Sequence, residues 1–280
     1  MEIVKDIKQM TQIARSLKMD GRKIVFVPTM GYLHEGHLSL VREGKKRGDT
    51  LVVSIYVNPA QFNEQCDYED YPVNLDRDKE LLEAEGCRIL FLPSSESMYP
   101  SGFETTVHVS GLSKGMCGDS RPGHFSGVAT VVAKLFNIVQ PDIAIFGEKD
   151  YQQLALIRRM VSDLDFNIEI VGMPIVRESD GLAMSSRNAR LSEDERMLSL
   201  SLSRALYSAM KIFEEGSCDA QRIIEGARGK IAGGIEIDYI DIRDAATLKP
   251  VDKVEGDALL AIAARVGKTR LIDNTILRRN

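Results

Sequence analysis

Two histidines three residues apart follow an apolar run near the start of the chain. The stretch "PTMGYLHEGHLSL" (residues 28–40) places His34 and His37 in one turn, together with Gly31 and Gly36. A zinc protease site needs histidines at positions i and i+4 of a helix, so this closer spacing argues against a metal site. The residues leave two interpretations open. One is a phosphate-binding turn at a helix start, where glycines let the backbone approach the ligand, and the other is an ordinary turn with solvated histidines.

A second stretch, "GLAMSSRNARLS" (residues 181–192), favours the phosphate interpretation. Ser185, Ser186 and Arg187 follow Met184 in a predicted loop. Two hydroxyls and a guanidinium offer several donors to a phosphate, and arginine can bind it through two hydrogen bonds. By itself the loop would also fit a solvated turn with a helix cap. The prediction of phosphate binding therefore depends on the presence of the histidine turn in the same sequence.

The stretch "FGEKDYQQL" (residues 146–154) lies at the end of a predicted strand. Lys149 can contact a phosphate as a point charge, and Asp150 can cap the next helix or join a Mg²⁺ shell. Gln153 comes one helical turn after Lys149 and is predicted to face the same cleft. A solvated turn between strand and helix is the alternative, and it fits Glu148 better than it fits Lys149.

Amide side chains follow another predicted strand, in "VNPAQF" (residues 57–62). Asn58 and Gln61 are uncharged groups of the kind that orient hydroxyls and carboxylates of small ligands. In "GDSRPGHFSGVATVV" (residues 118–132), Arg121 is a candidate anion donor, whereas His124 fits a residue that braces a loop. Taken singly, each of these residues would also fit an ordinary turn.

Three acidic residues, Asp76, Asp78 and Glu80, cluster at the start of a predicted helix. Acidic side chains at a helix N-terminus interact favourably with the helix dipole, and we prefer this role for them over Mg²⁺ binding. The Mg²⁺ ligands therefore stay unassigned.

Apolar runs alternate with helical patterns through the first part of the chain, and the unusual loops follow the runs. Buried strands are predicted at 23–29, 50–57, 88–93, 142–147 and 167–176, and helices at 4–18, 37–47, 74–86, 127–140 and 150–164. This alternation predicts an α/β fold, a Rossmann-like doubly wound parallel sheet with helices on both faces. Ligands bind such sheets at the carboxyl ends of the strands.

After residue 176 the pattern changes. Ser192 and Glu195 form a capping-box signature before a helix that runs to about residue 214, and a second helix is predicted near 219–232. Three short β-like runs follow, at 235–244, 258–266 and 269–276. We therefore predict a larger domain over 1–176 and a smaller α+β domain over 177–280.

Composition restricts the class of protein. The net charge of −5 and the pI near 5.6 argue against a nucleic-acid partner. No apolar run approaches the roughly 18 residues of a membrane span, and the charged start does not fit a signal peptide, so we expect no membrane partner and a cytoplasmic location. Cys66, Cys87, Cys117 and Cys218 are widely spaced, which favours inert thiols over disulfides or zinc.

Together, the HxGH turn and the Met-Ser-Ser-Arg loop resemble the "HIGH" and "KMSKS" signatures of nucleotidylyltransferases and class I aminoacyl-tRNA synthetases. The segments "VNPAQF", "RPGHF" and "GEKDYQQL" narrow the resemblance to the pantothenate synthetase (pantoate–β-alanine ligase) family. The matching segments run from residue 28 to 191 in the family's order.

The resemblance implies an ATP-dependent, AMP-forming amide ligase that makes pantothenate from pantoate and β-alanine through pantoyl adenylate. ATP is a substrate of this reaction, and Mg²⁺ is the implied cofactor. It implies catalytic roles for His34, His37, Lys149 and Arg187. The implied ATP-binding residues are Met30, Gly31, His34, Gly36, His37, Gly147, Glu148, Lys149, Asp150, Val176, Met184, Ser185, Ser186 and Arg187. The implied substrate-binding residues are Thr29, Met30, Asn58, Gln61, Arg121 and Gln153.

The family resemblance also implies a homodimer, and the run "TLVVSIYV" (residues 50–57) is a candidate sheet edge for pairing. The smaller domain is expected to act as a lid over ATP. Two alternatives remain: another HxGH nucleotidylyltransferase acting on a phosphorylated alcohol, and a nucleotide-binding module without turnover.

Overall fold

A parallel sheet of six strands carries the loops that the sequence singles out. The computed structural model describes residues 1–279, and within that range the strand order of this sheet is β1-β4-β3-β2-β5-β6, with all neighbours parallel. Its strands are β1 (Glu2–Val4), β2 (Ile24–Thr29), β3 (Thr50–Ile55), β4 (Ile89–Phe91), β5 (Ile143–Gly147) and β6 (Glu169–Met173). Nearly every residue of the inner strands is buried, which explains their continuous apolar sequences.

The strand order reverses between β2 and β5. From β2 the chain proceeds to β3 and β4 on one side, and it then returns to form β5 and β6 on the other side. Such a switch point is where parallel α/β sheets bind ligands, beyond the carboxyl ends of the strands. The loops that follow β2 and β5 contain the histidine turn and the Gly147–Asp150 stretch.

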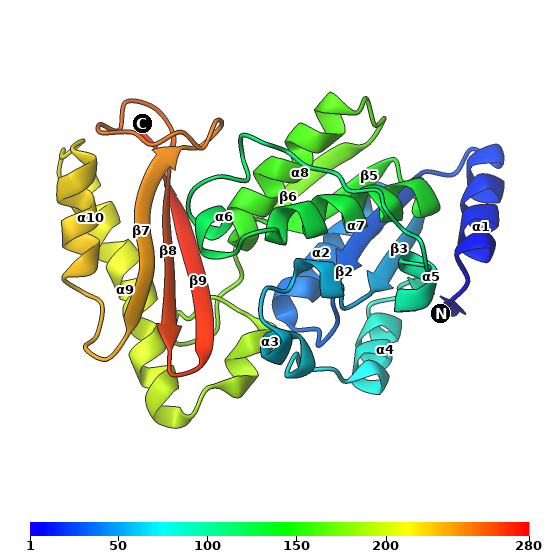
Figure 1. Cartoon of the computed structure of the whole chain (residues 1–280), viewed down its shortest axis with the longest axis horizontal. Helices are drawn as coiled ribbons and strands as arrows, with labels where there is room; N and C mark the ends of the chain where they lie inside the picture. Colours follow the sequence, from blue (N-terminus) through cyan, green and yellow to red (C-terminus); the bar gives the residue numbers. More distant parts are fainter. Residues whose placement is uncertain (280) are drawn as a thin grey trace. The chain divides into compact units, whose positions relative to one another are not determined.

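Helices cover both faces of this sheet (Figure 1). In α2 (Glu35–Arg47), Leu40 and Val41 pack in one buried cluster with Ile143 and Ile145 of β5. Phe146 points to the opposite face, because strand side chains alternate, and there it contacts Phe136 of α7 (His124–Val139). The remaining helices up to β6 are α1 (Ile7–Met19), η1 (Pro59–Gln61), α3 (Gln65–Glu69), α4 (Leu75–Ala84), α5 (Ser95–Met98), α6 (Cys117–Ser120), η2 (Glu148–Asp150) and α8 (Tyr151–Asp163).

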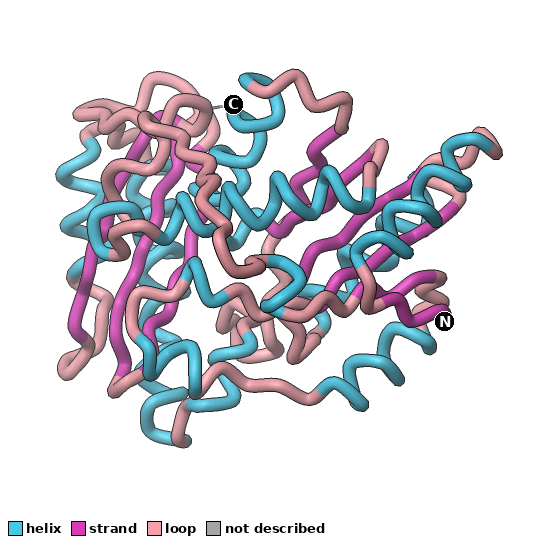
Figure 2. Tube along the Cα trace, turned by 45° about the vertical axis from the view of Figure 1, so that its right-hand side comes forward, coloured by secondary structure: helices cyan, strands magenta, loops and turns pink. Residues whose placement is uncertain are grey.

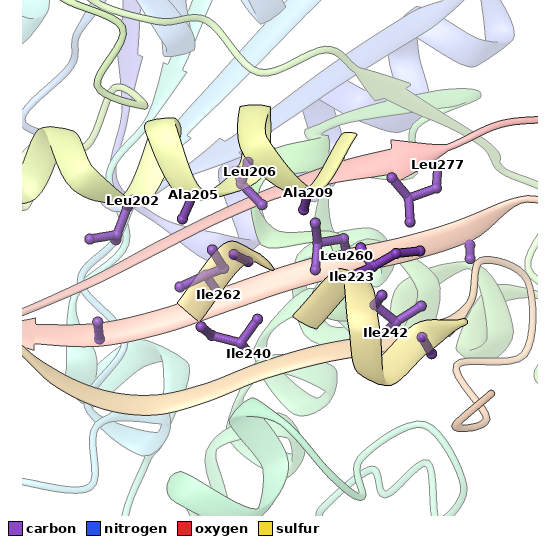
Figure 3. Packing of buried hydrophobic residues seen from close by; sticks show 14 of the residues in the cluster. Leu202, Ala205, Leu206, Ala209, Ile223, Ile240, Ile242, Leu260, Ile262 and Leu277 are labelled. Carbon is purple, nitrogen blue, oxygen red and sulfur yellow. The ribbon is translucent and has the colours of Figure 1, made fainter. Parts of the chain in front are cut away.

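A second, antiparallel sheet lies in the C-terminal part of the chain, in the order β7-β8-β9. Its strands are β7 (Glu236–Asp244), β8 (Ala258–Val266) and β9 (Thr269–Leu277), and the segment before it contains η3 (Ser186–Arg190), α9 (Glu193–Glu214) and α10 (Ala220–Arg228). Figure 3 shows how α9 and α10 pack on this sheet, with Leu206 and Ile223 facing Leu260 and Ile242. The predicted capping box is present, because Ser192 Oγ accepts from Glu195 N and Glu195 Oε2 accepts from Ser192 N.

The chain divides by its contacts into two compact units. The larger unit comprises Met1–Ser113, Arg121–Glu148 and Gln153–Pro174, and the smaller unit comprises Lys114–Ser120, Lys149–Gln152 and the described chain from Ile175 onward. Figure 2 traces the path by which the chain passes between strands, helices and loops. The predicted domain boundary after residue 176 stays a prediction.

The α/β class, the parallel sheet and the smaller α+β part are confirmed, whereas two details of the prediction are wrong. Val4 belongs to β1, which pairs with β4, and not to the predicted helix over 4–18. The run at 50–57 is no sheet edge, because β3 is paired on both sides, with β2 and with β4. Val4 continues the helical spacing of the apolar residues in α1, which hid the short strand. The continuous apolar run at 50–57 is typical of a strand that is buried and paired on both sides.

Three of the cysteines are thiols in the structure: Cys87 is buried, and Cys117 and Cys218 are half-buried. The side chain of Cys66 lies outside the described residues. Among the described helices, none combines the length and the apolar character needed to cross a membrane.

Candidate active site

The histidine turn joins the end of β2 to the start of α2. Thr29 ends the strand, and its Oγ1 donates to Ser54 O at 2.8 Å and accepts from Gly31 N at 3.2 Å. Gly31 has φ +83, and a Cβ at this position would lie 2.9 Å from Ile55 Cγ2. A glycine is therefore required here both by backbone conformation and by close packing.

His34 and His37 lie together at the start of α2, where His34 is the N-cap residue. Their ring centroids are 4.0 Å apart, and both side chains are half-buried. His37 Nδ1 accepts from His34 N at 3.3 Å. Neutral His37 must then carry its proton on Nε2, so it presents a donor at the helix start, one residue past Gly36. This geometry suits an anion better than it suits two solvated histidines.

A buried carboxylate holds the same turn, a role that the sequence did not predict. Asp78 is 1% exposed, and its two oxygens accept from Tyr32 N and Leu33 N, both at 2.7 Å. Burial raises the pKa of Asp78, whereas the two N–H donors and Arg77 act to lower it. Arg77 Nη1 also donates to Leu33 O at 2.8 Å. The first turn of α4 thus braces the histidine turn.

Asp76 and Asp78 lie in the first turn of α4, at the predicted helix start, and Asp78 has the bracing role in addition. Asn74 caps α4 by accepting from Arg77 N at 3.2 Å, while Asp76 and Glu80 are not buried. One signal was available in the sequence: Asp78 is spaced three residues from Leu75 and four from Leu82, on the apolar face of the helix. An acidic residue on such a face needs a buried partner.

Amide side chains form the next part of the site. Asn58 is 1% exposed, and its Nδ2 donates to Gln61 Oε1 at 3.0 Å and to Gly127 O at 3.2 Å. Gln61 Nε2 lies 3.1 Å from Met30 Sδ, in the segment that leads into the histidine turn. The structure therefore brings Met30, Asn58 and Gln61 together, as the sequence predicts.

Arg121 and His124 hold the main chain of Gln61. His124 Nδ1 lies 2.7 Å from Gln61 O, and Arg121 Nη2 donates to the same oxygen at 3.2 Å. His124 is buried, which fits the predicted role of bracing a loop. Arg121 is placed beside the predicted substrate residue Gln61, although its guanidinium contacts protein there.

The loop after β5 begins at Gly147. A Cβ built on Gly147 would meet no heavy atom within 4 Å, so packing within the protein does not explain this glycine. Glu148 begins η2, and Gln153 lies in the first turn of α8. Because β5 is paired with β2 in the sheet, this loop and the histidine turn follow neighbouring strands.

The smaller unit holds the remaining predicted residues, and Val176 and Met184 are joined directly. Met184 N donates to Val176 O at 3.0 Å, and Arg177 forms a β-bridge with Ala183. Ser185 caps η3 by accepting from Arg187 N at 3.3 Å, and Ser186 is buried. The loop is thus ordered around its own hydrogen bonds.

Strand β9 holds both this loop and Lys149. Asn274 Nδ2 donates to Lys149 O at 2.8 Å. The buried Asp273 binds Arg177 through two hydrogen bonds of 2.7 and 2.9 Å. Burial lowers the pKa of Lys149, and Arg187 acts in the same direction, while Asp150 and Asp273 oppose the shift. Sequence reasoning missed Asp273 and Asn274, because they lie far along the chain from the loops they hold.

Known proteins share this fold along its whole length. The family model described as pantoate-beta-alanine ligase matches residues 2–276. A pantothenate synthetase from Sulfurihydrogenibium sp. (strain YO3AOP1) is 56% identical over 277 residues, covering 98% of this chain and 99% of that protein. The crystal structure of pantothenate synthetase from Thermus thermophilus is similar with a TM-score of 0.94 at 42% identity, and the match covers 100% of both chains.

A further crystal structure adds ligands to the comparison. Pantoate-beta-alanine ligase from Francisella tularensis, described as complexed with beta-gamma ATP and beta-alanine, matches with a TM-score of 0.82 at 35% identity, covering 100% of this chain and 99% of that chain. The resemblance found in the histidine turn and its partner loops therefore extends to the whole sequence and to the fold. The chain belongs to the pantoate–β-alanine ligase family.

Proposed function

We propose that this chain catalyses the ATP-dependent condensation of pantoate with β-alanine to form pantothenate. The pantoate carboxylate attacks the α-phosphate of ATP, which gives pantoyl adenylate and pyrophosphate. The β-alanine amine then attacks the acyl carbon, and AMP leaves as the amide forms. Membership of the family supports this activity, and so does the description of the Francisella relative with beta-gamma ATP and beta-alanine.

One observation carries the proposal beyond family membership. Gln61 Nε2, a donor suited to an acid substrate, lies 3.1 Å from Met30 Sδ, and Met30 leads directly into the histidine turn. This contact supports a proposal in which a small acid bound at Gln61 lies beside a phosphate bound at the start of α2. This is the arrangement that attack of a carboxylate on a phosphate requires.

The residues present suit the charges of this reaction. A carboxylate is a poor acylating agent, because its leaving group would be an oxide, and adenylation replaces that group with AMP. Both reactants of the first step are anions, so the enzyme must supply donors and positive charge where negative charge develops. We assign this task to His37 and His34 at the helix start, and to Lys149 and Arg187.

The other residues of the two loops bind ATP. Gly147 leaves space in which a nucleotide can approach the backbone, since no protein atom fills the position of its missing Cβ. The proposed ATP-binding residues are Met30, Gly31, His34, Gly36, His37, Gly147, Glu148, Lys149, Asp150, Val176, Met184, Ser185, Ser186 and Arg187. Pantoate is bound by Gln61 and Gln153, with Thr29, Met30, Asn58 and Arg121 around them.

Magnesium accompanies ATP in this proposal. Among the side chains that the structure describes, no group of three or more histidine, cysteine or acidic residues could hold a metal ion. Mg²⁺ is often held by one or two carboxylates together with substrate phosphates, and the exposed Asp150 fits that role. The ion would neutralise phosphate charge when bound.

A product assay tests the proposed reaction. Purified protein is mixed with Mg²⁺-ATP, D-pantoate and β-alanine, and AMP, pyrophosphate and pantothenate are measured. We expect the three products in equal amounts, and sustained turnover only when β-alanine is present. Formation of ADP, or ATP consumption without pantothenate, would contradict the ligase assignment and favour another nucleotide-dependent activity.

We also propose a cytoplasmic homodimer in which residues 177–280 act as a lid over bound ATP. Sedimentation equilibrium at micromolar concentration tests the oligomeric state, and a monomer mass would contradict it. Crystal structures with and without ATP test the lid, since an unchanged angle between the two domains would exclude closure.

A further inference from the structure

The orientation of the Asn58 carboxamide is determined by a backbone carbonyl. Gly127 O can only accept a hydrogen bond, so the Asn58 atom that faces it at 3.2 Å must be the donor Nδ2. The approach is close because Gly127 has no side chain: a Cβ there would lie 2.2 Å from Ala60 O. The side chain of Asn58 is buried and therefore cannot exchange this partner for water.

The Asn58 carboxamide in turn fixes the orientation of the Gln61 carboxamide. The same Nδ2 of Asn58 lies 3.0 Å from the Gln61 carboxamide, so the facing atom of Gln61 must be its acceptor, Oε1. The other end of the carboxamide is then Nε2, whose neighbour at 3.1 Å is the sulfur of Met30. A thioether is a weak acceptor, which a substrate oxygen can replace. The Gln61 side chain is thus oriented to act as a hydrogen-bond donor through Nε2.

Tyr99 completes the chain of hydrogen bonds at its other end. Its hydroxyl lies 2.9 Å from Asn58 Oδ1, and it must donate because that oxygen can only accept. The ring is held in place by Phe103, at a centroid distance of 5.1 Å, and by Lys134, whose Nζ lies 5.9 Å from the ring centroid. Burial raises the pKa of Tyr99, so the phenol keeps its proton.

We propose that Tyr99 is a positioning residue for substrate recognition: through Asn58 it holds the Gln61 carboxamide with Nε2–H directed toward an acceptor oxygen of the acid substrate. Tyr99 itself contacts no substrate in this arrangement. Loss of its hydroxyl leaves Asn58 Oδ1 buried without a donor, so that Gly127 O alone still fixes the orientation of Asn58. Rotation of both carboxamides then costs less free energy and becomes more populated. Rotation would present Gln61 Oε1 to the substrate, where it repels a carboxylate. This inference rests on the proposed function only for the identity of the acid.

The test compares the half-buried Tyr99 with the buried Tyr56, whose hydroxyl has a different partner. Tyr99→Phe removes the donor to Asn58, whereas Tyr56→Phe removes a hydroxyl that pairs with Ser95 Oγ at 3.4 Å and does not contact Asn58. We expect Tyr99→Phe to weaken D-pantoate binding, measured by calorimetry, by about tenfold, the scale of one lost hydrogen bond. The Kd for ATP should stay unchanged, and Tyr56→Phe should change neither constant.

A double-mutant cycle separates positioning from general destabilisation. If Tyr99 acts through Gln61, then Tyr99→Phe has little further effect on pantoate binding in a Gln61→Ala background. Equal losses in both backgrounds, or a parallel loss of ATP binding, would overturn the proposal.

Nuclear magnetic resonance gives a readout that needs no substrate. The side-chain amide signal of Gln61, assigned by its loss in Gln61→Ala, should shift in Tyr99→Phe and stay in place in Tyr56→Phe. An unmoved signal in Tyr99→Phe would overturn the proposal. A shifted signal in a protein that binds no pantoate would support the positioning role of Tyr99 and contradict the proposed function instead.

Discussion

At the scale of single residues, hydrogen-bond partners fix the direction in which each polar group acts. His37 accepts at Nδ1 from the backbone of His34, so only Nε2 can carry the proton of the neutral ring. Gln61 accepts at Oε1 from Asn58, so its Nε2 is the donor. Both side chains therefore offer N–H groups, as expected in a site for anions.

Substitution of His37 tests the role of this donor. His37→Asn keeps an acceptor near His34 N and removes Nε2, so we expect turnover to fall about a hundredfold while the melting temperature stays within about 2 °C. Steady-state kinetics and thermal unfolding measure the two effects. His108→Asn, at an exposed histidine that pairs with Ser126, is the control and should keep normal turnover. Normal turnover in His37→Asn would contradict a catalytic role for the His37 imidazole.

Cys87 gives a pH dependence that is independent of the site. Burial raises the pKa of its thiol from 9.0 to about 11. The folded chain then holds a proton that the unfolded chain loses between these values, so the stability contributed below pH 9 is lost as the pH rises toward 11. The free energy of unfolding should fall more steeply over this window in the wild type than in Cys87→Ala, by roughly 2 kcal/mol. Parallel curves for the two proteins would contradict this.

At the scale of elements, the histidine turn depends on a helix far along the chain. Asp78 and Arg77 of α4 hold the backbone of Tyr32 and Leu33. Tyr32 has a φ of 49, in the left-handed region that residues other than glycine rarely adopt. Such a backbone conformation needs support from the surrounding structure. The conformation of the turn is thus supported by hydrogen bonds within the protein.

Asp78→Asn tests this bracing. An asparagine can accept from only one of the two N–H groups, because its second polar atom is a donor. We expect the free energy of unfolding to fall by about 2 kcal/mol and the KM for ATP to rise, as measured by denaturant unfolding and kinetics. Asp76→Asn, in the same helical turn but exposed, should leave both quantities unchanged. Equal behaviour of the two variants would refute a specific role for Asp78.

The elements that sequence periodicity could predict are those whose stabilising contacts are local or strongly apolar. The strand at Ile24–Thr29, the capped helix from Glu193 and the three C-terminal strands were all predicted close to their observed bounds. The strand β1 was missed because only pairing with β4 defines it. The same limit applies to the site, where Asp78, Tyr99 and Asn274 act on residues more than 40 positions away.

At the scale of the whole molecule, the predicted residues belong to two compact units. The histidine turn and the amides lie in the larger unit, while Lys149 and the loop with Arg187 lie in the smaller one, where Asn274 holds Lys149. The short segment Lys149–Gln152 therefore belongs by its contacts to the C-terminal unit, although it follows β5 directly. No pattern in the sequence indicated this.

The family assignment made from five motifs is confirmed over residues 2–276. The motifs were sufficient for this prediction because adenylation requires particular hydrogen-bond donors, and members of one family have these donors in the same loops after the strands. The supporting contacts that orient those donors required the structure.

Transfer of an isotope tests the central claim most directly. D-Pantoate labelled with heavy oxygen in its carboxylate is converted with Mg²⁺-ATP and β-alanine, and the products are analysed by mass spectrometry. Attack of the carboxylate on the α-phosphate, followed by attack of the amine on the acyl carbon, leaves one labelled oxygen on AMP. We predict one label in every AMP formed. Unlabelled AMP, or label in inorganic phosphate with ADP as the second product, would contradict an acyl-adenylate route.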